Sequence, residues 1–330
     1  MRLGYLTSKY PAVSHTFVQR EITALRTLGV EIETFSVWAA GDADVLTDDD
    51  RRERDATYAL LPPNVGDMLL AHLRALLTRP RGYARALGRA VALSTAGIRG
   101  RLLGLLWFAE AVVLWRECLR RDVRHLHVHI NGTAPAVALV TTFLGNGGRA
   151  AGDWSWSFTA HGPSEFYDAW RERLGDKVEH AAFVVCISDF ARSQVLTFAD
   201  HEWWDKVHVV HCGVDVRVFE PDGDGRERSA SDRGSPAEIL SVGRLVPFKG
   251  QAVLVRAIAE LARRGVPVRA TLIGDGPART QLESLARRLG VDGQITFTGA
   301  IGQDVIRRYY READVFCMSS FAEGIPVVLM

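Results

Sequence analysis

The chain has 330 residues, of which 47% are hydrophobic and 24% are charged, and its formal net charge at pH 7 is +1. This composition is typical of a globular protein with a real core, and it excludes both a disordered chain and one built from membrane-spanning segments. The near-neutral balance of charge gives no reason to expect a nucleic-acid partner. Because single cores stop growing near roughly 250–300 residues, the length predicts two domains.

The cysteines and the N-terminus bear on where the protein works. Cys118, Cys186, Cys212 and Cys317 stand far apart and form no C-x-x-C pair, which argues against a zinc knuckle or a disulfide framework. The chain runs from Met1 into an apolar strand pattern without a secretory leader, and no apolar run reaches about 18 residues. We therefore expect a cytoplasmic protein that does not span the membrane.

In the first 220 residues, β-branched and aromatic runs alternate with amphipathic stretches of helical length, which is the pattern of a parallel sheet covered by helices. The strands expected here are Leu3 to Leu6, Glu31 to Val37, His125 to Ile130, Ser157 to His161, Phe183 to Ser188 and Val207 to His211. Between them, Thr16 to Leu28 is expected to be a helix, and the acidic run from Asp42 to Asp55 a solvated loop.

The segment from Leu69 to Arg124 is unusually basic, with eleven arginines against three acids and mostly leucine and alanine elsewhere. One interpretation is a pair of surface helices whose arginines are simply solvated. The other is a patch for anionic lipid headgroups or for a charged acceptor. The sequence leaves both open.

Residues Pro221 to Ala237 are rich in Gly, Ser, Asp and Pro, so they predict an interdomain linker between an N-terminal domain of residues 1–220 and a C-terminal domain of residues 238–330. A second strand and helix series follows. It comprises Glu238 to Val242, Gln251 to Arg264, Arg269 to Ile273, Ala278 to Leu289, Ile295 to Phe297 and Val315 to Met318. The expected fold class is α/β, with two Rossmann-like doubly wound domains whose ligands bind outside the carboxyl ends of the strands, in a cleft between the domains.

Two segments of the second series carry residues suited to a phosphate ligand. Ser241 to Gly250 reads S-V-G-R-L-V-P-F-K-G, in which a strand ends in a loop and a helix begins. A helix N-terminus favours an anion, and Arg244 and Lys249 could bracket a diphosphate. Glu323 follows the strand from Val315, at the edge where such sheets bind ligands, although a carboxylate is also favoured at a helix start.

Together these segments resemble the retaining glycosyltransferases of the GT-B fold, glycosyltransferase family 4, and within it the exopolysaccharide and colanic-acid type. The shared motifs are Val242-Gly243-Arg244, Lys249-Gly250, Gly274-Asp275-Gly276-Pro277 and Glu323. The resemblance implies that Arg244 and Lys249 hold the donor diphosphate, that Glu323 contacts the transferred sugar, and that Gly243, Gly276, Ile301, Gly324 and Ile325 also border the donor. T-A-H-G at Thr159 to Gly162 resembles the family's histidine at the donor sugar, which makes His161 a second candidate catalytic residue.

The resemblance implies transfer of a sugar from a nucleoside-diphosphate sugar to a saccharide or a lipid-linked saccharide in cell-surface polysaccharide synthesis. It implies no metal or other cofactor, and it allows a location on the inner face of the cell membrane. The run of His125, His127 and His129 would place three imidazoles on one strand face, but no acidic or cysteine ligand accompanies them in the sequence, so we expect no metal there.

Two other functions stay open, namely a nucleotide-sugar epimerase of the same fold and a donor-binding chain without activity. A dehydrogenase is disfavoured because G-x-G at Gly274 is not G-x-G-x-x-G. The family's second glutamate would fall one position beyond Met330. We therefore expect an incomplete second domain with weak donor affinity and little activity.

Overall fold

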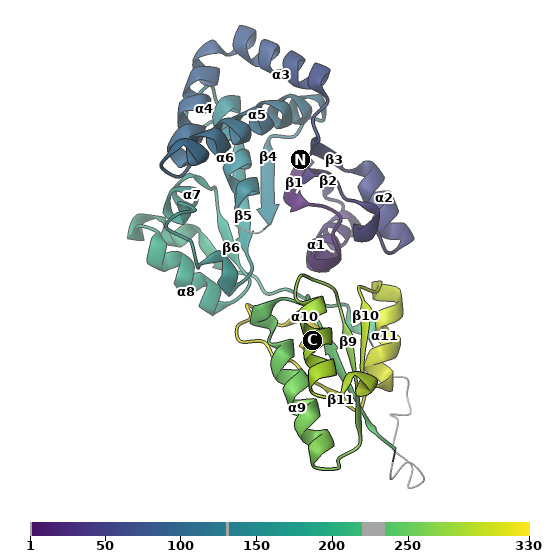
Figure 1. Cartoon of the computed structure of the whole chain (residues 1–330). Helices are drawn as coiled ribbons and strands as arrows, with labels where there is room; N and C mark the ends of the chain where they lie inside the picture. Colours follow the sequence, from purple (N-terminus) through teal and green to yellow (C-terminus); the bar gives the residue numbers. More distant parts are fainter. Residues whose placement is uncertain (1, 130–131, 220–234) are drawn as a thin grey trace. The chain divides into compact units, whose positions relative to one another are not determined.

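The computed structural model describes residues 2–129, 132–219 and 235–330, which form two compact units that divide between Cys212 and Gly213. In each unit, helices pack on a parallel β-sheet (Figure 1). The expected linker, Pro221 to Ala237, lies mostly outside the described residues and stays a prediction. Among the described helices, none combines the length and the apolar character that crossing a bilayer requires.

The N-terminal unit contains a parallel sheet whose described strands run in the order β3-β2-β1-β4-β5-β6-β7. Its strands are β1 (Arg2–Lys9), β2 (Glu31–Trp38), β3 (Tyr58–Leu61), β4 (His125–His129), β5 (Ser155–Ala160), β6 (Val184–Cys186) and β7 (Val207–Val209). Its helices are α1 (Thr16–Thr27), α2 (Asp48–Ala56), α3 (Val65–Thr78), α4 (Pro80–Leu93), α5 (Ile98–Arg120), α6 (Thr133–Gly145), α7 (Leu174–His180) and α8 (Asp189–Phe198). The strand order reverses direction between β1 and β4, which makes this pair the switch point of the sheet.

The core of this unit lies between the sheet and α5 and α6. Val128 and Phe158 of the central strands are fully buried, as are Leu114 and Trp115 of α5. The central strands β4 and β5 alternate apolar with polar residues, and the apolar ones pack in this core. The short strand β3 was not predicted, because a run of only four apolar residues is too short to distinguish a strand from a helix.

The acidic run was wrongly expected to be a loop. Residues from Asp48 onward form α2, in which the Thr47 side chain accepts a hydrogen bond from the Asp50 amide while the Asp50 carboxylate accepts one from the Thr47 amide. The positive end of the helix dipole also stabilises the three aspartates in the first turn. The repulsion among like charges, which suggested a loop, is therefore outweighed by capping.

The basic segment forms three helices rather than the expected pair. Pro80 begins α4 directly after α3, and Gly97 separates α4 from α5. The second half of α5 is core rather than surface, since Trp107, Ala111 and Cys118 are buried there. In Figure 1 these three helices gather at the top of the N-terminal unit.

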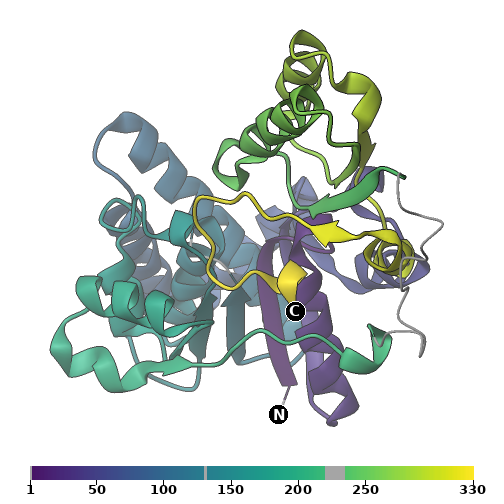
Figure 2. The ribbon, with the colours of Figure 1, turned by 90° about the horizontal axis from the view of Figure 1, so that it is seen from below.

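The C-terminal unit contains a smaller parallel sheet whose described strands run in the order β10-β9-β8-β11. Its strands are β8 (Ala237–Val242), β9 (Val268–Ile273), β10 (Ile295–Gly299) and β11 (Val315–Phe316), and its helices are α9 (Gln251–Arg263), α10 (Arg279–Arg288) and α11 (Gln303–Glu312). Figure 2 shows β8 beside β11. The order reverses between these two strands, so the switch point of this sheet lies there.

Candidate functional site

The switch point of the N-terminal unit gathers histidines from β4 and from the end of β5. His125, His127 and His129 alternate along β4, so all three point to one face of the sheet, as the sequence predicted. His161 follows the last residue of β5. The pairing of β4 with β5 sets His129 opposite Thr159, two residues before His161.

Two of these histidines are held by hydroxyl groups of β5. His127 contacts Ser157 through Nδ1 at 2.8 Å and Thr159 through Nε2 at 3.0 Å. His125 contacts Ser155 and Ser157 in the same way, at 2.8 Å each. Because hydroxyls can donate or accept, they satisfy a neutral imidazole of either tautomer. Burial lowers the pKa of His127 to about 3, so this ring is neutral at physiological pH.

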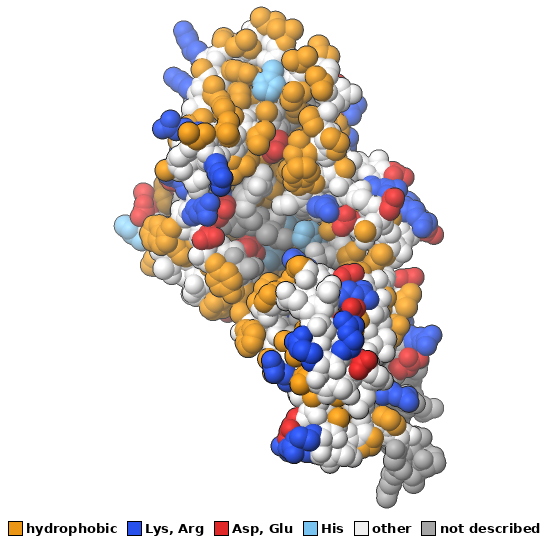
Figure 3. Space-filling view, viewed as in Figure 1, with side chains coloured by type: hydrophobic (Ala, Val, Ile, Leu, Met, Phe, Trp, Pro, Cys, Tyr) orange, Lys and Arg blue, Asp and Glu red, His pale blue; other side chains and the backbone are white. Residues whose placement is uncertain are grey.

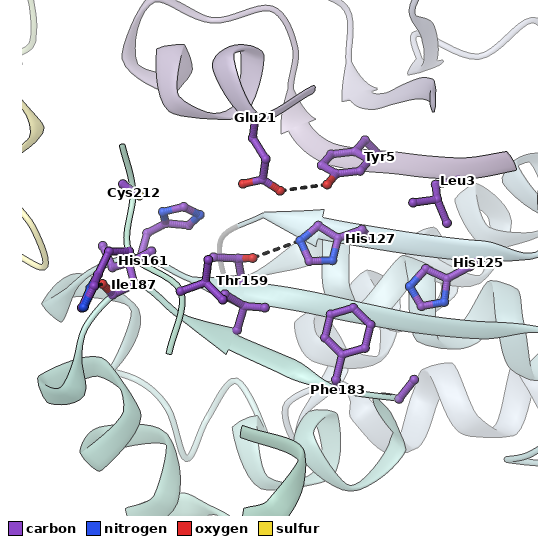
Figure 4. A pocket seen from close by; sticks show the side chains of 14 residues that line it. Leu3, Tyr5, Glu21, His125, His127, Thr159, His161, Phe183, Ile187 and Cys212 are labelled. Carbon is purple, nitrogen blue, oxygen red and sulfur yellow. Dashed lines mark hydrogen bonds between the residues drawn. The ribbon is translucent and has the colours of Figure 1, made fainter. Parts of the chain in front are cut away.

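His129 links the partly exposed carboxylate of Glu21 to His161. Its Nδ1 lies 2.8 Å from His161 Nε2, and its Nε2 lies 3.4 Å from Glu21 Oε1. His129 itself is fully buried. The Tyr5 hydroxyl donates to the same Glu21 oxygen at 2.8 Å, as the dashed line in Figure 4 marks. Glu21, His129 and His161 thus form a continuous chain of polar groups.

Helix α1 supplies the groups that fix this arrangement. Phe17 and Glu21 are four residues apart, so they share one face of the helix. The Phe17 ring lies 4.3 Å from the His161 ring, centroid to centroid. Two adjacent turns of α1 therefore contact both ends of the His129–His161 pair.

The pKa shifts in this cluster follow from burial and from its polar partners. Burial opposes ionisation of Glu21, but His129 and the Tyr5 hydroxyl beside it outweigh that effect and lower the pKa of the carboxyl group. Burial, together with His129, lowers the pKa of His161 well below its ordinary value. At neutral pH the cluster therefore pairs a carboxylate with a neutral His161, which can accept or donate a hydrogen bond.

The same groups bear on metal binding. One ligand atom each from Glu21, His127 and His129 lies within 4.8 Å of the others, which is a ligand set that could hold a metal ion. His127 would first have to release one of its two hydroxyl contacts. The acid that sequence reasoning missed is Glu21, which lies about a hundred residues from the histidines along the chain. Its only signal was its place on the apolar face of the first helix.

A cavity of about 470 Å³ opens over this face of the sheet, within the N-terminal unit. Tyr5, Glu21, His127 and Thr159 border it, His161 lies at one end, and Phe183 forms an apolar wall (Figure 4). The cavity is thus mostly apolar with a few convergent polar groups at the carboxyl end of the sheet. This is the usual character of a small-molecule site.

In the C-terminal unit, the loops after β8 and β11 meet at the switch point. Lys249 Nζ donates to Glu323 Oε1 at 2.6 Å, and both side chains are mostly buried. Two further bonds join the loops, from Ser319 Oγ to the Lys249 carbonyl at 3.1 Å and from the Phe321 amide to the Phe248 carbonyl at 2.9 Å. The structure therefore brings together Lys249 and Glu323, which stand 74 residues apart in the chain.

Glycines permit the loops after β9 and β11 to approach the loop after β8 closely. Gly250 has φ +66°, and a Cβ there would lie 2.0 Å from the Ser319 carbonyl oxygen. Gly276 has φ +158°, and a Cβ there would lie 2.4 Å from the Leu245 carbonyl oxygen. Both positions need a residue without a side chain, for the backbone angle and for the space.

The remaining predicted donor residues lie around the same loops. The Arg244 side chain is exposed, while its carbonyl accepts from Gln251 Nε2 at 2.9 Å, which ties the loop to the first turn of α9. Gly243 precedes it, and Ile301 packs on the small core of Leu240, Ile273 and Ile306. Gly324 and Ile325 follow Glu323 directly and are partly exposed. His161 belongs to the other unit.

The fold and the switch-point residues define a protein of the two-domain, Rossmann-like class called GT-B. Solved structures share the fold along nearly the whole chain. Anabaena HepE in complex with UDP and glucose matches 99% of this chain and 77% of its own, with a TM-score of 0.65 and 15% identity. A glycosyltransferase from Rickettsia africae matches 97% of this chain and 73% of its own, with a TM-score of 0.55 and 16% identity.

The sequence comparisons find a family match in the C-terminal part of the chain. Residues 226–330 match the family "Glycosyl transferases group 1". This match confirms the resemblance seen in the motifs of the C-terminal unit.

Curated relatives agree with this assignment. A putative glycosyltransferase EpsF of Bacillus subtilis is 33% identical over 129 residues, which cover 38% of this chain and 33% of the relative. A GDP-mannose-dependent phosphatidylinositol monomannoside mannosyltransferase of Mycolicibacterium smegmatis is 36% identical over 114 residues, which cover 34% of this chain and 30% of the relative. The chain thus matches about a third of the length of these relatives.

Proposed function

We propose that this protein transfers a sugar, with retention of configuration, from a nucleoside-diphosphate sugar to an acceptor. The observation that carries the proposal is the Lys249–Glu323 pair at the switch point between β8 and β11. A cation and a carboxylate side by side, at the carboxyl edge of a Rossmann-like sheet, suit a ligand that has both phosphate and hydroxyl groups.

The C-terminal unit would bind the donor through its diphosphate. Lys249 has three N–H donors, so it can keep its bond to Glu323 while it donates to a phosphate oxygen. Arg244, exposed on the same loop, would supply a second positive charge, and the N-terminus of α9 a third. Gly243, Gly276, Ile301, Gly324 and Ile325 would line the donor with backbone and small side chains.

In the reaction, negative charge develops on the departing diphosphate while the anomeric carbon becomes cation-like. Arg244 and Lys249 would stabilise that leaving group, a role for which preorganised donors commonly contribute about 3–4 kcal/mol. Glu323 would hold hydroxyl groups of the transferred sugar. His161 is held by His129 as a neutral imidazole and would donate a hydrogen bond to a substrate hydroxyl group or accept one from it.

The acceptor in this proposal is a saccharide or a lipid-linked saccharide used in cell-surface polysaccharide. A relative named for phosphatidylinositol monomannoside, which joins a sugar to a lipid, supports the lipid-linked alternative. The proposed location is the cytoplasmic face of the cell membrane.

Titration calorimetry with UDP and GDP tests the donor site. Lys249→Ala and Arg244→Ala each remove a charged hydrogen-bond donor, which is worth about 1.5–3 kcal/mol, so the Kd should rise roughly ten- to a hundredfold. Arg287→Ala removes an exposed arginine near the end of α10 and is the matched control. If both loop variants bind as tightly as the control variant, the diphosphate assignment is wrong.

Turnover distinguishes transfer from its alternatives. Incubation with a nucleoside-diphosphate sugar and a lipid-linked saccharide should release the nucleoside diphosphate only when the acceptor is present. Isomerised donor in the absence of acceptor would instead identify an epimerase. Tight nucleotide binding without either product would identify a donor-binding role.

A further inference from the structure

Helix α3 turns its large apolar side chains toward solvent and its small ones toward the protein. Leu69, Leu73 and Leu77 are exposed by 63%, 54% and 72%, whereas Ala71 and Ala75 are fully buried. Residues three or four positions apart share a helix face, so the leucines form one stripe and the alanines the opposite one. This is the reverse of a helix that simply covers a core with its apolar face.

The first half of α5 repeats this reversal. Ile98, Leu102 and Leu106 are exposed by 81%, 55% and 58%, while Gly100 and Gly104 are buried. A Cβ at Gly104 would lie 2.8 Å from the Ala90 carbonyl oxygen, so this glycine lets α4 and α5 pack closely. The small residues thus make the contacts within the unit and leave the large ones outside.

The two stripes belong to one surface because α3 packs against α5. We call this surface the leucine face. It consists of Val65, Leu69, Leu70, Leu73, Leu76, Leu77, Ile98, Leu102, Leu103, Leu105 and Leu106, each at least 39% exposed. Figure 3 shows apolar side chains gathered over these helices, at the top of the view. Soluble monomers rarely expose so many contiguous apolar side chains, and such patches usually mark an interaction site.

The exposed charges around the leucine face are positive. Arg74, Arg81, Arg85, Arg99 and Arg101 are all exposed on α3, α4 and α5. Between residues 68 and 121 the acids are Glu110 and Glu117, and both are buried. Asp67, just before this range, is paired with Arg116 at 2.9 Å. The surface therefore combines leucines with arginines and presents no exposed carboxylate along that stretch.

We propose that the leucine face lies in the surface of an anionic lipid bilayer, with its leucines at the level of the acyl chains and its arginines among the headgroups. Burial of apolar area and attraction to anionic lipid act together in such helices. Charge complementarity favours lipid over a second copy of this chain, because a symmetric contact would bring the same arginines against one another. Of the two interpretations of the basic segment, the structure favours lipid binding, since solvated helices would not expose this leucine stripe.

Vesicle flotation tests the proposal with the full chain. Vesicles of phosphatidylcholine mixed equally with phosphatidylglycerol should bind it at least tenfold more tightly than phosphatidylcholine alone. The paired substitutions Leu73→Gln with Leu77→Gln, and Leu102→Gln with Leu106→Gln, should each lower that binding at least tenfold. Leu28→Gln with Leu289→Gln, at exposed positions elsewhere, is the matched control and should bind as the wild type does.

Charge and insertion are tested separately by three further variants. Arg99→Gln with Arg101→Gln should weaken binding to anionic vesicles several-fold, whereas Arg51→Gln with Arg52→Gln on α2 should not. Leu73→Trp should gain a blue-shifted emission that brominated lipid quenches. Unchanged tryptophan fluorescence without vesicles verifies the fold of the N-terminal unit in each glutamine variant.

Three results would overturn the proposal. The first is equal vesicle binding by the leucine variants and their control. The second is a Leu73→Trp emission that brominated lipid does not quench. The third is a concentration-dependent dimer, seen by sedimentation without vesicles, that the leucine variants abolish, since this would assign the face to a second copy of the chain.

Discussion

Substitution of Gly250 by alanine probes the contact between the two loops of the C-terminal site. The left-handed backbone, at φ +66°, costs an alanine about 1–2 kcal/mol. The added Cβ would also lie 2.0 Å from the Ser319 carbonyl oxygen, so one loop must move by about an ångström or more. Such overpacking costs typically 1–3 kcal/mol. We therefore expect Gly250→Ala to destabilise the C-terminal unit by about 2–5 kcal/mol.

Gly265→Ala is the matched control, because Gly265 has φ +72° but no atom lies within 4 Å of the place that a Cβ would take. It should cost only the backbone term, about 1–2 kcal/mol. Hydrogen exchange of the β8 and β9 amides is the suitable measurement, since all eight tryptophans lie in the N-terminal unit and report on that unit alone. Gly250→Ala should also weaken UDP or GDP binding, while Gly265→Ala should not. Equal effects of the two substitutions would refute the loop contact.

Two further predictions concern carboxyl groups of the N-terminal unit, the buried Glu110 and the partly exposed Glu21, and urea unfolding followed by tryptophan fluorescence measures both. Burial raises the pKa of Glu110 from 4.5 to about 7, so the folded state loses stability as pH rises through that window; Glu110→Gln should therefore stabilise the unit by up to about 3 kcal/mol at pH 8 and by little at pH 4. A stabilisation that does not change with pH would contradict this account. The lowered pKa of Glu21 stabilises the folded state above about pH 4.5, and this contribution is lost as pH falls further; Glu21→Gln should therefore cost about 1–2 kcal/mol at pH 7, with a smaller difference from wild type near pH 3. An equal cost at both pH values would show that its charge is not what holds His129.

The sequence by itself determined the α/β class, the family and the places of the main motif residues. β-branched and aromatic runs that alternate with amphipathic stretches predicted the central strands, because a parallel sheet covered by helices leaves that pattern. Lys249 and Glu323 could be placed in loops that follow strands, because apolar runs that end at Val242 and Met318 precede those loops. Boundaries were less exact, as in β11, which ends at Phe316 rather than Met318, because only pairing with β8 decides where a strand stops.

Only the tertiary structure decided which distant groups meet. No local pattern could show that Glu21 of α1 reaches His129 of β4, because that contact depends on the order of strands in the sheet. The sequence also could not show which face of α3 is buried and which is exposed to solvent. Leucine is the residue that a core normally takes, and the reversal arises because α3 and α5 pack through alanines and glycines, which allow close approach and leave the leucines exposed.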